Sequence, residues 1–274
     1  MKFYSILFTL CCSCLFAKPQ LSDFKRNVYS QWGEDGIIEQ IFSVIGTSSK
    51  IAVEFGAADG FAFSNTANLW TSDRSWVAYL IESNSLAYNS LVNNVASYPC
   101  VPIHRSVGIS PTDCLEAILN EFGVDSTIDI LSIDIDGNDY YIFENLAALR
   151  PRLVICEYNP TIPAHLDLYA TYNNYMGCSV AALQRVAKNK GYSLVAITET
   201  NCFFVRDEEF PLFAEYETER EKICINRFIR YLITDYAGIY SIVTGKDFLE
   251  PYGINHPSSQ PIEGEFIKLP LQTD

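Results

Sequence analysis

The sequence of 274 residues predicts an α/β domain, in which a mainly parallel sheet is covered by helices on both faces. Short strand-like apolar runs alternate with helical segments along most of the chain, which is typical of parallel sheets. Two further strand-like runs follow each other across a tight turn, so an antiparallel hairpin is expected to close the sheet. Hydrophobic residues make up 49% of the chain, which is enough for a full core.

The first helix is predicted after residue 33, because acidic residues open it and apolar residues recur at helical spacing up to Ile45. Five strand-like runs follow, at residues 51–55, 77–81, 101–104, 128–134 and 153–158. Helical segments separate them, at residues 64–71, 85–95, 111–122 and 139–148. A last helix at residues 179–190 ends at Gly191, and the hairpin strands are expected at residues 192–198 and 202–205.

The two ends of the chain differ from this pattern. Lys2, an apolar run at residues 3–16 and the small Ala17 are typical of a secretory signal peptide. We therefore expect residues 1–17 to direct export to the outside, a periplasm or a secretory lumen, with a cytoplasmic location as the alternative. The run is too short for a stable membrane span, which needs roughly 20 apolar residues. Residues 18–206 form the predicted domain, and residues 207–274 form a charged, then proline-rich appendage without its own core.

Charge and cysteine content exclude two classes of function. A net charge of −14 argues against binding to nucleic acid, because affinity for the phosphate backbone depends on a basic surface. Six cysteines lie outside the leader, and none forms a C-x-x-C pair or a cysteine–histidine cluster, so a zinc site is not expected. Cys156 and Cys202 lie in strand-like runs and are predicted to be buried. Disulfide pairing and oligomeric state cannot be predicted from the sequence.

The first predicted strand ends in the stretch Glu-Phe-Gly-Ala-Ala-Asp-Gly, which contains the candidate binding residues Glu54, Gly56, Ala57, Asp59 and Gly60. Ligands of open α/β sheets bind beyond the carboxyl ends of the strands, where glycine lets the backbone approach them closely. Asn65 opens the next helix, and Glu82 ends the second strand, where an acid can hold a ribose diol. This pattern favours S-adenosylmethionine, the methyl donor, over a dinucleotide. The alternative is that these acids cap a helix, a turn and a strand end.

Three further acids follow the fourth and fifth predicted strands. Asp134 and Asp136 leave the strand end on one face, and Glu157 ends the neighbouring strand. Carboxylates that converge in a cleft repel one another unless one is protonated or they share a cation. Asp134, Asp136 and Glu157 are therefore candidate catalytic residues, acting as a base for a substrate hydroxyl or as ligands of a divalent cation such as Mg²⁺. The alternative is that Asp136 belongs to a turn that caps the next helix.

Together these stretches resemble the FkbM-type branch of class I S-adenosylmethionine-dependent methyltransferases. The resemblance extends over residues 29–207, and its motifs lie at residues 30–36, 53–60, 64–66, 68–70, 80–82, 131–139, 154–160, 177–179 and 190–192. It implies a Rossmann-like, seven-stranded, mostly parallel sheet in the order 3-2-1-4-5-7-6. The predicted hairpin then supplies the last two strands.

The resemblance also implies roles for individual residues. Glu54, Gly56 and Asp59 would surround the methionine part of the donor, and Glu82 would hold its ribose. The pair Ser106–Val107 would lie near the adenine, and Asp134 would face the sulfonium. Residues 160–177, which contain Tyr169, Tyr172 and Tyr175, and the segment before Gly33 would cover the cleft. The tyrosines would stack on an acceptor ring or pack over the sheet edge.

The function predicted from these features is O-methylation of a hydroxyl on a sugar, a glycan or a small metabolite. One alternative is a catalytically degenerate methyltransferase fold that acts as an exported binding or structural module. A further alternative is metal-dependent hydrolysis at the cluster of Asp134, Asp136 and Glu157.

Overall fold

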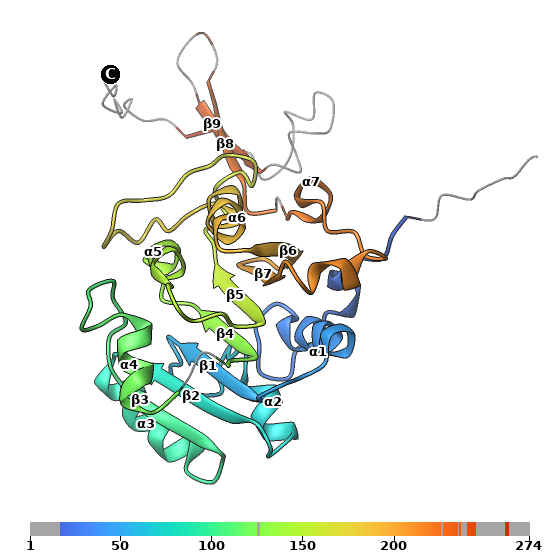
Figure 1. Ribbon diagram of the computed structural model, residues 1–274. Helices are drawn as coiled ribbons and strands as arrows, with labels where there is room; N and C mark the ends of the chain where they lie inside the picture. The colour runs from blue at the N-terminus through green and yellow to red at the C-terminus, as the bar shows by residue number, and fades with distance from the viewer. Residues whose placement is uncertain are drawn as a thin grey trace, which may run out of the picture.

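The computed structural model describes residues 17–124, 127–225, 227–234, 236, 240–244 and 261–262. Except for Ala17, the predicted signal peptide lies outside these residues. The seven-stranded sheet has the order β3-β2-β1-β4-β5-β7-β6, which confirms the predicted order (Figure 1). Its strands are β1 (Ile51–Phe55), β2 (Val77–Glu82), β3 (Cys100–His104), β4 (Ile130–Ile133), β5 (Leu153–Glu157), β6 (Tyr192–Ile197) and β7 (Asn201–Arg206). β1 to β5 are parallel, whereas β7 is antiparallel to both β5 and β6.

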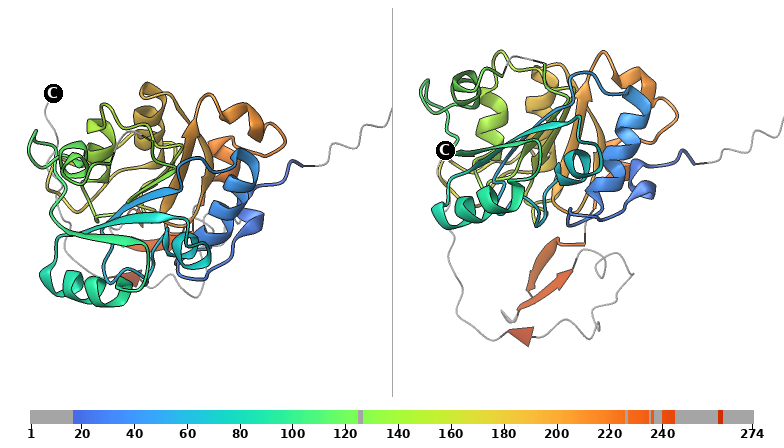
Figure 2. Two further views of the ribbon diagram at one scale, coloured as in Figure 1. Left: turned by 60° about the horizontal axis from the view of Figure 1, so that its bottom comes forward. Right: turned by 90° about the horizontal axis from the view of Figure 1, so that it is seen from below.

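Helices cover both faces of this sheet, as Figure 2 shows. One face packs against α1 (Glu34–Ile45), α2 (Ala67–Ser72) and α3 (Ser85–Val95). The other packs against α4 (Leu115–Glu121), α5 (Asp139–Asn145) and α6 (Val180–Asn189). The strands are apolar on both faces because alternate side chains point to opposite helix layers: Ala52 joins the first core and Val53 the second.

Three helices differ from the prediction by three or more residues at one end, and tertiary contacts explain the differences in α2 and α5. The third, α4, begins at Leu115 instead of residue 111. α2 begins at Ala67 instead of residue 64, because the hydroxyls of Ser64 and Thr66 bind the carboxylate of Glu54. α5 ends at Asn145, short of residue 148, because the next backbone amides, those of residues 147 and 148, donate to the carboxylate of Glu116. Side chains that are distant in sequence thus compete with the helix for these residues.

The C-terminal part begins with two short helices, η2 (Phe210–Phe213) and α7 (Arg220–Ile223). Phe213 and Ile223 are buried in the two cores of the domain. Three strands that the sequence analysis did not predict follow: β8 (Arg230–Thr234), β9 (Tyr240–Thr244) and β10 (Pro261–Ile262). They pair in a separate antiparallel sheet, seen at the top of Figure 1. The boundary between domain and appendage at residue 206 stays a prediction.

Cys156 and Cys202 are buried, as predicted, and face each other in register on β5 and β7. All six cysteines of the described chain are free thiols. No helix within the described ranges has the length and apolar character needed to cross a membrane.

Candidate functional site

The turn after β1 is built around Gly56, whose φ of +76° is a conformation that side chains rarely adopt. A Cβ atom at this position would lie 1.7 Å from the carbonyl oxygen of Asp134, so glycine allows the turn to pass directly against the end of β4. The amides of Gly56 and Ala57 both donate to the carbonyl of Ile81, which joins the turn to β2 (3.1 Å each). The ends of β1, β2 and β4 therefore meet at this glycine.

Two of the predicted donor-binding acids hold this turn in place. The carboxylate of Glu82 accepts hydrogen bonds from the amides of Ala58 (2.8 Å) and Asn84 (2.6 Å). The carboxylate of Asp59 accepts from the amides of residues 61 and 62 at 3.0 and 2.8 Å. Gly60 also has a positive φ, and a Cβ atom there would lie within 3 Å of Leu91 and Val95 on α3.

Glu54 lies on β1, two residues before Gly56, and is buried. Its carboxylate accepts three hydrogen bonds from the segment that precedes α2. The donors are the hydroxyls of Ser64 and Thr66, each at 2.6 Å, and the amide of Asn65 at 2.8 Å. The side chain of Asn65 in turn donates to Ser132 on β4 at 3.0 Å. Burial raises the pKa of Glu54. This network connects β1, β4 and α2.

The loop between β4 and α5 carries the predicted catalytic Asp136. Its φ is +56°, which is uncommon for a residue other than glycine, and such strain is concentrated at functional sites. Asp139 holds the loop from below, because its carboxylate accepts from the amides of Ile135 and Gly137, each at 2.8 Å. A Cβ atom on Gly137 would lie 2.9 Å from the carbonyl oxygen of Asn174, so the loop also packs closely against the 160–177 segment.

Asp134 and Glu157 form a hydrogen-bonded carboxyl pair at the ends of β4 and β5. The two strands pair in register up to Ile133 and Cys156, so the residues that follow lie side by side. Burial and the mutual repulsion of the acids raise the pKa of Asp134 to about 7 and that of Glu157 to about 9. The pair therefore keeps at least one proton at neutral pH, and Glu157 is its more basic member.

A cavity of about 310 Å³ opens where these loops meet. Three of the predicted binding residues line it: Gly56, Ser106 and Val107. Of the predicted catalytic residues, Asp136 lines it. The sequence analysis missed the lining residues Ser83, Arg105, Asn138, Asn173 and Asn174. Ser83 and Arg105 directly follow the last residues of β2 and β3, so their position after a strand end was the available signal.

A second cavity of about 180 Å³ adjoins the first and shares Asp136, Gly137 and Tyr175 with it. Its other lining residues are Asp139, Glu157, Tyr158, Asn159, Pro160, Met176 and Gly177. Two of the three predicted catalytic acids, Asp136 and Glu157, therefore face one small space, and Asp136 also faces the larger one. The remaining predicted residues line neither cavity: Glu54, Ala57, Asp59, Gly60, Asn65, Glu82 and Asp134. Their contacts to a methyl donor stay a prediction.

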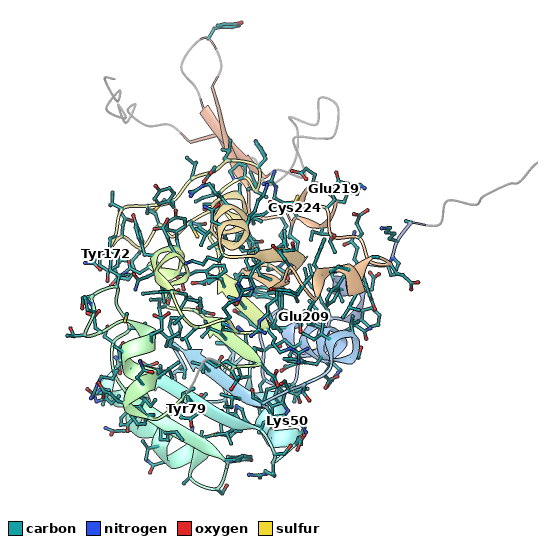
Figure 3. All side chains as sticks on the ribbon, in the orientation of Figure 1. Lys50, Tyr79, Tyr172, Glu209, Glu219 and Cys224 are labelled. Carbon is teal, nitrogen blue, oxygen red and sulfur yellow. The ribbon has the colours of Figure 1, made fainter. Side chains whose placement is uncertain are left out.

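Part of the predicted cover is present in the structure. Residues 173–177 form a wall of both cavities, and the side chain of Tyr175 is 90% exposed. The other two tyrosines pack on α5: the ring of Tyr169 stacks on Tyr140, with their centroids 4.2 Å apart, and Tyr172 meets Tyr141 edge-on. Figure 3 labels Tyr172. Of the three, Tyr175 alone is placed to meet a ligand in these cavities.

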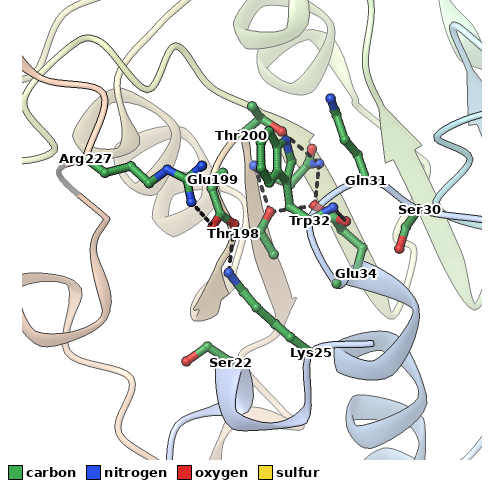
Figure 4. A network of polar contacts seen from close by, with 12 residues as sticks. Ser22, Lys25, Ser30, Gln31, Trp32, Glu34, Thr198, Glu199, Thr200 and Arg227 are labelled. Carbon is green, nitrogen blue, oxygen red and sulfur yellow. Dashed lines mark hydrogen bonds and ion pairs between the residues drawn. The ribbon is translucent and has the colours of Figure 1, made fainter. Parts of the chain in front are cut away.

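The segment before Gly33, which was also expected to cover the cleft, lines neither cavity. The β6–β7 turn is held instead by Glu34, the first residue of α1, which directly follows this segment, as Figure 4 shows. The fully buried carboxylate of Glu34 accepts from the hydroxyl of Thr198 at 2.7 Å, the side-chain amide of Asn201 at 3.3 Å and the backbone amide of Trp32 at 2.6 Å. Asn201 pairs in register with Glu157, so this contact lies directly beside the carboxyl pair.

Ionic contacts strengthen the same turn. Glu199 accepts from Lys25 at 2.7 Å and from Arg227 at 3.3 Å (Figure 4). The turn also holds the end of β5, because the amide of Tyr158 donates to the carbonyl of Thr200 (2.7 Å) and its hydroxyl donates to the carbonyl of Thr198 (2.9 Å). The N-terminal segment thus supports the strand end that carries Glu157.

Among the residues that the structure describes, no group of three or more histidine, cysteine or acidic side chains is arranged to hold a metal ion. The predicted divalent cation at Asp134, Asp136 and Glu157 is therefore unsupported. The proton shared by Asp134 and Glu157 accounts for the close approach of these two carboxyl groups.

The carboxyl pair predicts how stability depends on pH. Because both pKa values are raised, the folded protein holds a proton that the unfolded chain releases, so stability falls as the pH rises from about 5 to about 9. Replacing Glu157 by glutamine removes the titration of this carboxyl group. We expect the free energy of unfolding of the variant to fall by several kcal/mol less than that of the wild-type protein over this range, because each unit of pKa shift corresponds to about 1.4 kcal/mol. Denaturant unfolding at several pH values measures the difference. Equal slopes for both proteins would contradict the shared proton.

Comparison with known proteins adds a resemblance to one family. Residues 104–193 match the family model described as Methyltransferase FkbM domain. The resemblance to FkbM-type methyltransferases is confirmed. The match includes β4, the loop of Asp136 and β5, and extends over about a third of the chain. Together with the strand order, it supports an S-adenosylmethionine-dependent methyltransferase with the class I methyltransferase fold. No curated protein matches the sequence.

Solved structures with similar folds include a SAM-dependent methyltransferase from Aquifex aeolicus, at 10% identity and a TM-score of 0.39, covering 63% of this chain and 88% of that one. M. jannaschii TYW2 in complex with AdoMet is 15% identical, with a TM-score of 0.35, and covers 66% of this chain and 79% of its own. M. capricolum TrmK in complex with S-adenosyl-homocysteine is 16% identical, with a TM-score of 0.37. The match covers 61% of this chain and 66% of that one. The strand order, and not these low-scoring likenesses, carries the assignment of fold.

Proposed function

We propose that this FkbM-type protein transfers the methyl group of S-adenosylmethionine to a hydroxyl of a sugar, a glycan or a small metabolite. The observation that supports this proposal is the position of Asp136, which faces both cavities at once. The larger cavity suits the donor, since its volume falls in the range of small-molecule sites and the missing Cβ of Gly56 leaves room at the turn. The smaller cavity would take the acceptor.

The donor supplies an activated methyl group when bound, so the protein has to align the acceptor and remove a proton. The carboxylate of Asp136 is suited to take that proton, since it is exposed and has no hydrogen-bond partner among the described residues. Glu157 is less suited, because it already donates its proton to Asp134. Gly56, Ser106 and Val107 would hold the donor, and Tyr175 would cover the junction of the two cavities.

Replacing Asp136 by asparagine tests the role of the base. Asparagine tolerates the left-handed backbone conformation of this position, so the loop is expected to keep its shape. We expect turnover to fall by about 10²–10⁴-fold, the usual contribution of a general base, while donor affinity changes by less than about threefold. The exposed Asp73→Asn variant is the control and should keep full activity. Unchanged turnover in Asp136→Asn would remove Asp136 from the mechanism.

The proposed function as a whole is tested by calorimetric titration with S-adenosylmethionine and with its demethylated product. Both are expected to bind at one site and to compete with each other. A panel of hydroxylated acceptors, with release of the demethylated product as the readout, then tests for transfer. If neither compound binds, the function fails and the alternative of an exported binding or structural module gains support. Export itself stays a prediction from residues 1–17.

A further inference from the structure

The second cavity has an unusual charge. Three acidic side chains line it, Asp136, Asp139 and Glu157, and its other seven lining residues include no lysine, arginine or histidine. Arg105 lines only the first cavity, where its guanidinium pairs with Glu121 at 3.3 Å. Glu157 is protonated at neutral pH, so Asp136 and Asp139 carry the charge of the second cavity, and no cation among its lining residues offsets it.

Several hydrogen-bond donors around this cavity are already in use. The amide of Gly137 donates to Asp139 (2.8 Å), that of Tyr158 to the carbonyl of residue 200 (2.7 Å), and that of Asn159 to the carbonyl of residue 178 (2.8 Å). The amide of Met176 donates to the side chain of residue 174 at 2.9 Å.

Two side-chain donors are occupied in the same way. The amide nitrogen of Asn159 donates to the carbonyl of Met176 (2.9 Å), and the hydroxyl of Tyr158 donates to the carbonyl of Thr198 (2.9 Å). Sites that bind carboxylate or phosphate need free N–H groups or cations. This cavity has no cation among its lining residues; it presents carboxyl oxygens, which accept hydrogen bonds from a ligand, and the exposed hydroxyl of Tyr175.

The size of the cavity limits what can enter. Its volume of about 180 Å³ is below the roughly 300 Å³ at which typical small-molecule pockets begin. It therefore has room for a single ring or for the end of a longer molecule. Because it opens next to Asp136, the group that enters is the one that would be methylated.

We propose that the second cavity selects acceptors by charge: it binds the hydroxyl-bearing end of an uncharged or cationic molecule and rejects one that carries a carboxylate or phosphate. This inference rests on the proposed function. Its physical basis is that a bound anion would face the carboxylates of Asp136 and Asp139 with no lysine, arginine or histidine to offset their charge, whereas a hydroxyl or ammonium group would donate to carboxylate oxygen.

The test compares acceptors that share one scaffold. Methyl glycosides of glucose, glucuronic acid and glucosamine are used with the full chain and saturating S-adenosylmethionine, and the corresponding galactose series repeats the comparison. Release of the demethylated donor is measured at low ionic strength. We expect kcat/KM for the neutral and amino sugars to exceed that for the uronic acid at least tenfold in each series.

A positive charge introduced into the wall of the second cavity tests for a gain of activity on the uronic acid. Met176 lines the second cavity and is 59% exposed, so Met176→Lys is expected to be tolerated. The added ammonium should reduce the preference against the uronic acid at least tenfold. The matched control is Leu86→Lys on α3, a position that is 80% exposed and lines neither cavity, where the preference should not change.

Each outcome decides between the alternatives. A wild-type protein that methylates the uronic acid as well as the neutral sugar overturns the inference, as does Met176→Lys with an unchanged preference. Donor binding without transfer to any sugar also overturns it, because this cavity would then not take hydroxylated rings. Absence of donor binding in the parallel calorimetric titration contradicts the proposed function itself, and the inference with it.

Discussion

Replacing Gly56 by alanine is expected to abolish measurable donor binding and to lower the free energy of unfolding by about 2–4 kcal/mol. The added Cβ would lie 1.7 Å from the carbonyl oxygen of Asp134, so the turn has to move away from β4. That movement displaces the wall of the larger cavity and the start of the loop that carries Asp136. Calorimetric titration with S-adenosylmethionine and denaturant unfolding measure the two effects.

Gly46 is a matched control for this substitution. It also has a positive φ, of +68°, but no atom lies within 4 Å of the position that its Cβ would take. Gly46→Ala therefore carries the backbone strain without the clash, and we expect it to cost about 1 kcal/mol and to leave donor affinity unchanged. If both variants lost the same stability and the same donor affinity, the close contact between Gly56 and β4 would not contribute to donor binding.

The second large effect is expected at Glu34, which lines neither cavity. Glu34→Ala removes a buried carboxylate and leaves the hydroxyl of Thr198 and the amides of Asn201 and Trp32 without their acceptor. We expect the free energy of unfolding to fall by about 2–4 kcal/mol. Because Asn201 pairs with Glu157, turnover should also fall more than donor affinity.

Glu39→Ala on the same helix is the control. Its ion pair with Arg26 is half exposed, and such pairs contribute little to stability, so a loss below about 1 kcal/mol is expected. Thermal unfolding is measured for both variants, and their steady-state kinetics are measured at 25 °C. Equal losses in the two variants, or a Glu34 variant with normal turnover, would show that the N-terminal segment does not support the end of β5.

Most of the fold and part of the site could be predicted from the pattern of residues. Apolar runs at strand length, separated by amphipathic segments, identified all seven strands of the main sheet, because burial on both faces leaves a local signal. The same pattern placed Asp136 and Glu157 at the ends of adjacent strands, where the structure brings them to one cavity. The strands β8 to β10 were missed, although β8 and β9 are rich in β-branched and aromatic residues, because the whole C-terminal region was interpreted as an appendage without its own core.

The roles of Glu54 and Glu34 could not be read in the same way. A glutamate near the end of a strand or at the start of a helix can contact a ligand or accept hydrogen bonds from the protein itself. Only its partners in the structure show which role it has. For Glu54 the partners are Ser64, Asn65 and Thr66. For Glu34 they include Thr198 and Asn201, more than 160 residues away.

The sequence alone determined the order of strands and helices and the residue types at the carboxyl edge of the sheet, because both follow from local periodicity and strand ends. The tertiary structure alone decided that Asp134 and Glu157 share a proton, that Asp136 lies between two cavities and that the N-terminal segment braces β5. Proton sharing and cavity shape depend on distances of a few ångströms between side chains from different strands and loops. Such distances arise only when the whole chain is packed.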